Sequence, residues 1–428
     1  MYKLILIILL TLSIDAKEIY SVDKLILEAL KNSPDLDISA SEYKASQSRY
    51  DKAFSGYLPK LDLHLNAGQT SMSDMANNPN NMIDDTLMLG KLSLKQIIYD
   101  FGKTGGSVDS FKYDSDSYLN ANEQKISDKK MDVKTTYYQV LQSIALINVN
   151  KENVKLNEIQ LYRSKKYFEA GIRTKIDVSD AKVELIKSQL DLKKSLYDLK
   201  LSYADLDEVV GFEEVDKRYK VYSKELVLET IYESLSDYDL TLIDSINFAY
   251  KNRYELKKYL SNIQSTKASG EIASSEYYPQ LYFNADYTKQ EVDKLKVLMP
   301  EQQWNAMLNL DWNIYQGGAT SAFTQEQQIN LSISKSQLQS SKLSIKKDIT
   351  QAYINIHKTK DSVELSQSLL EVSKEKFGQA QQRYEHGLSD YIELQQARQG
   401  YIDAKSSLVV DYYNYYAAIA TLDNAIGK

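Results

Sequence analysis

Apolar residues recur at two different intervals along this chain, and the longer interval predicts helices that pack in pairs. A seven-residue step runs through positions 178–206, 349–370 and 394–422. An apolar step of seven sustained over several turns makes a narrow seam and a left-handed supercoil. The pattern therefore favours coiled-coil-like packing over the broader core face of an ordinary globular helix.

Between the helical stretches the interval becomes two, which predicts β-strands. Apolar and polar residues alternate through 61–68, 92–98, 281–288 and 304–315. Strands of about 9–12 residues have the length that spans a membrane, and Trp304 stands at a strand end where an aromatic girdle forms. A soluble hairpin with one buried face shows the same alternation, but these two features favour a membrane. The segments 71–85 and 289–303 are expected to form polar tips outside the cell.

The chain contains one unit written twice. Asn32 and Asn252 end matching tetrapeptides 220 positions apart, whereas Gly171 and Gly387, farther along, are 216 positions apart. The offset changes once, inside the predicted hairpin. We therefore divide the chain into a signal peptide (1–16), a first repeat (17–211, hairpin at about 58–100), a linker (212–243) and a second repeat (244–428, hairpin at about 279–316).

Helix lengths suggest how each repeat is built. The predicted helices 103–169 and 320–385 would each extend about 100 Å at 1.5 Å per residue. The return helices 175–210 and 389–426 are about half as long, and the first helices 22–54 and 244–276 have about the missing length. Two short helices stacked end to end would match one long helix. This predicts a helical cylinder with a β-hairpin at one end and tight turns at the other.

Composition narrows the function. Residues 4–12 form an apolar run too short to cross a bilayer, so residues 1–16 are interpreted as a signal peptide rather than a short membrane anchor. The net charge of -7 is mildly acidic and does not indicate the basic surface that binds nucleic acid. With no Cys and three scattered His residues, neither a metal site, a cofactor nor a catalytic constellation is indicated. We therefore expect no enzymatic activity.

Four strands cannot close a barrel, and an open edge in lipid leaves unpaired backbone groups. Other copies must then supply the remaining strands. Three copies give twelve strands and a water-filled lumen, whereas the eight strands of two copies would enclose mostly side chains. The sequence thus favours an oligomer, with a trimer preferred.

The order of these features resembles the TolC family of outer membrane efflux proteins, and the resemblance covers nearly the whole mature chain. Its motifs are short sequences at the strand and helix junctions, namely Tyr57-Leu58-Pro59, Tyr278-Pro279, Tyr99-Asp100-Phe101-Gly102 and Tyr315-Gln316-Gly317-Gly318, and the turns Gly171 to Asp177 and Gly387 to Glu393. The fold class expected is a mixed α/β membrane protein, in which duplicated helical hairpins form a periplasmic tunnel and four strands per chain join a trimeric twelve-stranded barrel.

The resemblance implies a homotrimeric duct in the outer membrane of a Gram-negative bacterium, in contact with outer-membrane lipid and extending into the periplasm. The duct would serve efflux or type I secretion with a periplasmic adaptor and an inner-membrane pump of RND, ABC or MFS type. It would act passively and open its periplasmic end on recruitment. A poreless surface coiled-coil or adhesin protein is the alternative. The sequence does not identify the exported cargo, because the pump and the adaptor select it.

The resemblance also suggests site residues. Family gates are closed by polar links near the turns, which map to Asp177, Asp180 and Tyr384, with a hydrogen bond expected between Asp177 and Tyr384. The narrowest acidic ring maps to Glu393 and Gln396, the latter neutral here. The turns expected to face the adaptor contain Gly171, Arg173, Gly387 and Ser389. The aromatic residues expected at the membrane girdle are Trp304 and Trp312.

Overall fold

The computed structural model describes residues 18–74, 78–212, 219–223, 226, 228–293, 295 and 300–428. The predicted signal peptide, 1–16, lies outside the described residues. The chain divides into two compact units that cut across the sequence repeats. One unit joins Gln124–Arg253 and Ser344–Lys428 with the N-terminal part up to Asp37, and the other joins Ile38–Glu123 and Tyr254–Leu343.

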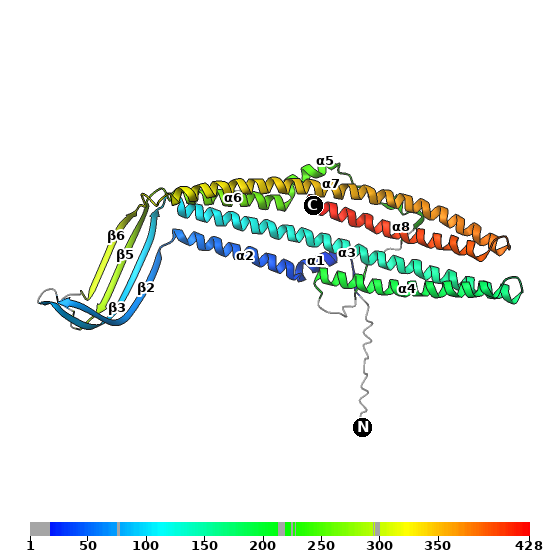
Figure 1. Ribbon diagram of the computed structural model, residues 1–428, viewed down its shortest axis with the longest axis horizontal. Helices are drawn as coiled ribbons and strands as arrows, with labels where there is room; N and C mark the ends of the chain where they lie inside the picture. Colours follow the sequence, from blue (N-terminus) through cyan, green and yellow to red (C-terminus); the bar gives the residue numbers. More distant parts are fainter. Residues whose placement is uncertain are drawn as a thin grey trace, which may run out of the picture. The chain divides into compact units, whose positions relative to one another are not determined.

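The elements form two series in the same order, and their helices have closely matched lengths (Figure 1). The first contains α1 (Val22–Asn32), α2 (Pro34–Phe54), β2 (Lys60–Asp74), β3 (Asn78–Tyr99), α3 (Lys103–Glu169) and α4 (Lys175–Val210). The second contains α5 (Leu242–Asn252), α6 (Tyr254–Ser275), β5 (Gln280–Glu291), β6 (Gln302–Asp311), α7 (Ala319–Glu385) and α8 (Tyr391–Ile426). Helices α3 and α7 both have 67 residues, and α4 and α8 both have 36.

The first helix of each series is broken, where the sequence predicted one continuous helix. Ser33 has extended backbone and caps α1 before Pro34, and Arg253 has extended backbone between α5 and α6. Proline cannot donate a hydrogen bond into a preceding turn, which explains the first break. At each break the end of a return helix comes close: a Cβ atom on Gly211 would lie 2.6 Å from the carbonyl oxygen of Asn32.

The four long strands form one antiparallel sheet in the order β2-β3-β5-β6 (Figure 1). The segment 71–85, expected to form a polar hairpin tip, is the end of the β2–β3 hairpin, and the two strands stay paired into it through Met72 and Ile83. Paired backbone groups satisfy each other whatever the polarity of the side chains, so polar residues extend the strands. The strand predicted over 304–315 ends earlier, at Asp311.

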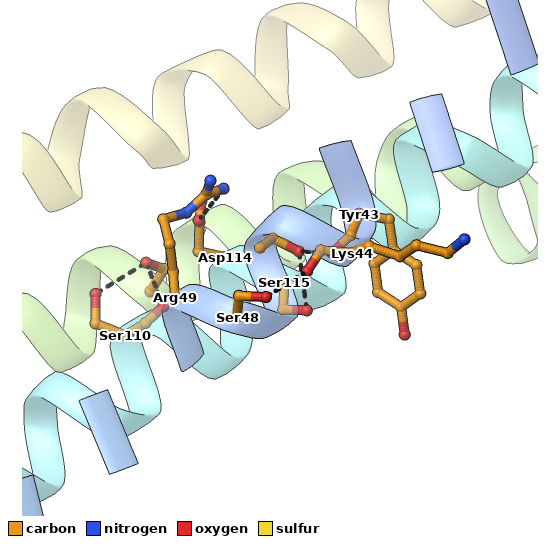
Figure 2. Close-up of polar contacts among 9 residues, drawn as sticks. Tyr43, Lys44, Ser48, Arg49, Ser110, Asp114 and Ser115 are labelled. Atoms are coloured by element: carbon orange, nitrogen blue, oxygen red, sulfur yellow. Dashed lines mark hydrogen bonds and ion pairs between the residues drawn. The ribbon is translucent and has the colours of Figure 1, made fainter. Parts of the chain in front are cut away.

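Helices α2 and α6 cover α3 and α7 near the sheet through small and polar side chains. Figure 2 shows Arg49 of α2 at Asp114 of α3, where the guanidinium and the carboxylate are 3.4 Å apart. Ser110 of α3 hydrogen-bonds to Ser265 of α6 at 3.1 Å. Short side chains let helix backbones approach closely, so this part of the chain is packed by hydroxyl contacts more than by large apolar groups.

The seven-residue seams are buried to different extents. The seam of α8, including Leu408 and Leu422, is buried, and so is that of α7 from Ile349 to Leu370. The predicted seam of α4 is only half-buried until Leu206, and the small residues beside it are buried instead: Ala181, Ser188, Ser195 and Ser202. Helix α4 therefore lacks a neighbour along one side of the single chain.

The linker between the two series adds short elements that the sequence did not predict. They are β4 (Tyr219–Val221) and the 3-10 turns η2 (Leu228–Thr230) and η3 (Tyr232–Ser234). Strand β4 pairs in parallel with β1 (Glu18–Tyr20), which lies at the start of the first repeat. Among the residues that the structure describes, no helix combines the length and the apolar character needed to cross a membrane.

Candidate functional site

Two tight turns close the helical hairpins α3–α4 and α7–α8, and both are built on glycine (Figure 1). Gly171 and Gly387 have φ of +72° and +74°, a conformation that costs L-residues energy. The next amide reaches back over the helix end: the Ile172 N–H donates to the Tyr167 carbonyl at 2.9 Å, and the corresponding bond of Leu388 is 2.8 Å. This geometry ends each long helix sharply.

Arg173 joins the two turns. Its guanidinium donates to the carbonyl oxygen of Ser389 at 3.0 Å and, more weakly, to that of Tyr384 at 3.4 Å. The same group lies 4.7 Å from the centre of the Tyr384 ring, a cation–π distance. The half-buried Arg173 side chain is thus engaged within the chain and binds the first repeat to the second. We call this set of three contacts the arginine clasp.

Tyr384 is brought close to Asp177, but their expected hydrogen bond is not formed. The Tyr384 side chain is 2 % exposed, and its hydroxyl has no well-formed hydrogen bond among the described residues. Burial raises the pKa of Tyr384, Ser164 and Arg173 oppose that shift, and the Asp177 charge adds to it. The Asp177 carboxylate instead accepts from the Thr174 N–H at 3.2 Å and so caps α4.

The acidic positions of the predicted gate differ in their surroundings. Glu393 is half-buried, and its carboxylate lies 3.2 Å from the Arg383 guanidinium. Asp180 and Gln396 are exposed on α4 and α8. Ser389 is half-buried, and its hydroxyl has no partner among the residues described. The structure therefore gathers Arg173, Tyr384 and Ser389 at one contact and leaves Asp180 and Gln396 outside it.

Two further features of the turns were not predicted. Arg163 of α3 forms an ion pair with Glu385 of α7, a second link between the repeats. Large apolar side chains also stand in solvent at both turns, at equivalent positions in the two repeats: Ile172, Ile176, Leu388 and Ile392. Matching apolar positions after Gly171 and Gly387 were the signal in the sequence that could have revealed this surface.

The sheet exposes apolar residues along one face. Leu63 and Leu65 of β2 and Leu308 and Leu310 of β6 are all more than half exposed in the single chain. Trp304 is 75 % exposed near the start of β6. Trp312 follows the end of β6, and its indole N–H donates to the Tyr277 carbonyl at 3.1 Å. The apolar face predicted from the alternation thus exists and is uncovered.

Comparison with known proteins identifies the family. The family model described as outer membrane efflux protein matches residues 25–212 and 246–428, which leaves out only residues 1–24 and the segment 213–245 around the linker. No curated protein sequence matches the chain significantly.

Several solved structures share the fold at low sequence identity. The CmeC outer membrane channel of Campylobacter jejuni superposes with a TM-score of 0.82 at 18 % identity, covering 95 % of this chain and 85 % of that one. The outer membrane protein VceC of Vibrio cholerae gives 0.82 at 14 % identity, covering 95 % and 96 %. CusC, solved in relation to transmembrane channel formation, gives 0.83 at 15 % identity, covering 95 % and 92 %. Together, the family match and the fold lead to one conclusion: this chain belongs to the outer membrane efflux protein family and is a non-enzymatic outer-membrane efflux channel, with a periplasmic helical tunnel, of the TolC-like kind that forms trimers within tripartite efflux pumps.

Proposed function

We propose that three copies of this chain assemble through the uncovered side of α4. Large side chains recur there every seven residues and stay about half exposed or more, at Val183, Leu190 and Tyr197. Helix α7 carries an exposed pair at the same interval, Leu365 and Val372. Seven-residue steps on two helices suit supercoiled packing between copies. Closing a ring of such contacts would cover both apolar stripes.

The sheet supports the same assembly. With the order β2-β3-β5-β6, strands β2 and β6 are the edges, and their outer backbone groups need partners in lipid. Edges from neighbouring copies can pair, so that three copies supply twelve strands. The exposed apolar face would then contact outer-membrane lipid. Trp304 and Trp312 are eight positions apart, about 26 Å along a strand at 3.3 Å per residue. In a strand tilted by about 40° this corresponds to about 20 Å across the membrane, which would place the two residues near opposite sides of an apolar band about 25 Å tall.

The turns would form the gate at the periplasmic end. The arginine clasp and the Arg163–Glu385 pair both hold the first repeat against the second. Releasing them would let one hairpin move without unfolding either. Glu393, Gln396, Asp177 and Asp180 remain candidates for lining the passage.

The partner at this end would be a periplasmic adaptor that couples the channel to an inner-membrane pump. The exposed apolar residues of both turns offer it a contact surface, since Ile172 and Leu388 are at least 65 % exposed. Gly171 and Gly387 lie beside them and keep the turns compact. Whether the pump is of RND, ABC or MFS type is set by that partner, which also determines the cargo.

The gate proposal rests on the arginine clasp. The assembly proposal rests on the exposed stripe of α4 formed by Val183, Leu190 and Tyr197. We would substitute Leu190→Asp and Tyr197→Asp in the detergent-extracted protein and measure the mass of the assembly by light scattering. Gln189→Asp, which is exposed and turned about 100° from the Leu190 side chain around α4, is the matched control. We expect trimers for the wild type and the control and smaller species for the two stripe variants. Intact trimers in all four proteins would place the interface elsewhere.

A further inference from the structure

One buried charge near the turns has no ion-pair partner. Arg398 of α8 is 4 % exposed, yet it forms no salt bridge within the part of the chain that the structure describes. It lies beside the Tyr391 hydroxyl, which is itself buried and without a well-formed hydrogen bond there. A guanidinium stays protonated at any accessible pH. Burying it without an anion is unfavourable, so an anion supplied from outside the chain would stabilise it.

Arg398 lines a small pocket of about 100 Å³ between α3, α7 and α8. Its polar lining consists of two guanidinium and two amide side chains, and its remaining lining is apolar: Arg163, Arg398, Gln160 and Gln381; Leu156, Ile159, Phe377 and Leu394. All the charge in this lining is positive. Two carboxylates lie nearby. Glu385 is already bound by Arg163 and by Gln381, and Glu184, whose charge acts on Tyr391, is paired with Lys187. The pocket therefore has donors and positive charge in excess.

We propose that this pocket binds a carboxylate, delivered as an Asp or Glu side chain of the periplasmic adaptor. A guanidinium presents a planar fork that matches a carboxylate, and the amides of Gln160 and Gln381 offer further donors. The volume of about 100 Å³ is enough for a carboxylate with its adjoining methylene groups. Leu394 and Phe377 would pack against those methylene groups.

The position of the pocket favours a protein side chain over a free anion. Arg163 lies six residues before the end of α3, and Arg398 lies seven residues after the start of α8. Both are thus about 10 Å from the turns along the helices. A partner that covers Ile172 and Leu388 would carry its own residues past the pocket. The identity of this occupant rests on the proposed function, whereas the carboxylate chemistry rests on Arg398 alone.

The occupant would also act on the gate. Its carboxylate would contact α3 through Arg163 and α8 through Arg398, and these helices belong to different repeats. It would compete with Glu385 for Arg163, whose ion pair is one of the two links described between the repeats near the turns. Docking of the partner would thereby weaken the Arg163–Glu385 pair.

The carboxylate site is tested first without any partner. The detergent-extracted trimer is titrated with 3,3,3-trifluoropropionate, a small carboxylate, and binding is followed by ¹⁹F NMR line broadening. We expect broadening that propionate reverses and neutral propionamide does not. Arg398→Gln should weaken binding at least tenfold, as expected for loss of a charge-assisted hydrogen bond. Lys166→Gln removes one exposed charge from the same end of α3 and should leave binding unchanged.

Arg163→Gln is the second pocket variant, used should Arg398→Gln fail to assemble. Equal broadening in the wild type and in both pocket variants would mean nonspecific anion binding and would overturn the site. No broadening in a wild-type trimer that conducts ions would overturn the site while leaving the channel function intact.

The source of the carboxylate is tested by genetics in cells that depend on this channel. Arg398→Glu should abolish efflux, and suppressors are selected in the gene of the adaptor. We expect changes of Asp or Glu to Lys or Arg, which restore the opposite charge. Suppressors that restore efflux without reversing an acidic residue of the adaptor would reject it as the source. A wild-type trimer without conductance would instead count against the proposed function itself.

Discussion

Removing the arginine clasp should open the channel. Arg173→Gln deletes the bond to the Ser389 carbonyl at 3.0 Å, the weaker bond to Tyr384 at 3.4 Å and the cation–π contact at 4.7 Å. One good charged hydrogen bond and one half-exposed cation–π contact together contribute about 2 kcal/mol. That energy corresponds to a factor of about 30 in the closed-to-open ratio of each chain. The channel should therefore spend far more time open.

Single-channel recording in a planar bilayer measures this effect directly. Arg173→Lys keeps the charge but loses the planar fork, so it should give an intermediate open fraction. Lys166→Gln removes a nearby exposed charge that does not link the repeats and should behave as the wild type. Unchanged conductance in an assembled Arg173→Gln trimer would show that the clasp does not hold the gate.

Three further predictions concern stability and use thermal unfolding of the extracted protein. Gly211→Ala should lower the free energy of unfolding by about 2 kcal/mol or more, because φ is +80° and the added Cβ would lie 2.6 Å from the Asn32 carbonyl oxygen. Gly171→Ala, at a similar φ but in open space, should lower it by about 1 kcal/mol. Equal losses in the two variants would refute the close contact at Gly211. Burial raises the pKa of Asp423 above 3.8, so the folded chain binds the carboxyl proton more tightly than the unfolded chain does. At higher pH the carboxyl group is ionised, and its burial then opposes folding. Asp423→Asn should accordingly raise the melting temperature at pH 7 but not below pH 3.8, and no gain at pH 7 would contradict this reasoning. Burial raises the pKa of Tyr137 from 10.0 to about 12, so the protein should lose stability as pH rises through that range. Tyr137→Phe has no ionisable hydroxyl and should lose less stability there. An identical alkaline transition in that variant would show that Tyr137 does not cause the loss.

Periodicity in the sequence predicted the long elements well. The helix expected at 103–169 is α3 to the residue, because Gly102 and Gly171 are sharp boundaries at its two ends. The breaks after α1 and α5 were missed, although Pro34 is a local signal for the first. Arg253 carries no such signal, since that break depends on the approach of the α8 end, where Gly427 meets Arg253.

The sequence predicted where the candidate site lies in the chain but not which side chains contact each other there. Gly171 and Gly387 located both turns from the sequence, yet the contact of Arg173 with Ser389 was not predicted. Which side chain reaches across two turns depends on the rotation of the helices about their axes, and a repeat pattern does not specify that rotation. The burial of Arg398 was missed for the same reason: a charged residue on a helix is normally interpreted as exposed.

Conductance of the wild-type protein tests the central conclusion most directly. The purified, detergent-extracted trimer is added to a planar lipid bilayer. Single-channel current is recorded for the wild type and for the double variant Arg173→Gln with Arg163→Gln, which removes the two links between the repeats near the turns. We predict small, steady current steps for the wild type and several-fold larger steps or open times for the double variant. A folded trimer that inserts into the bilayer and carries no current in either form would contradict a channel closed at its periplasmic turns.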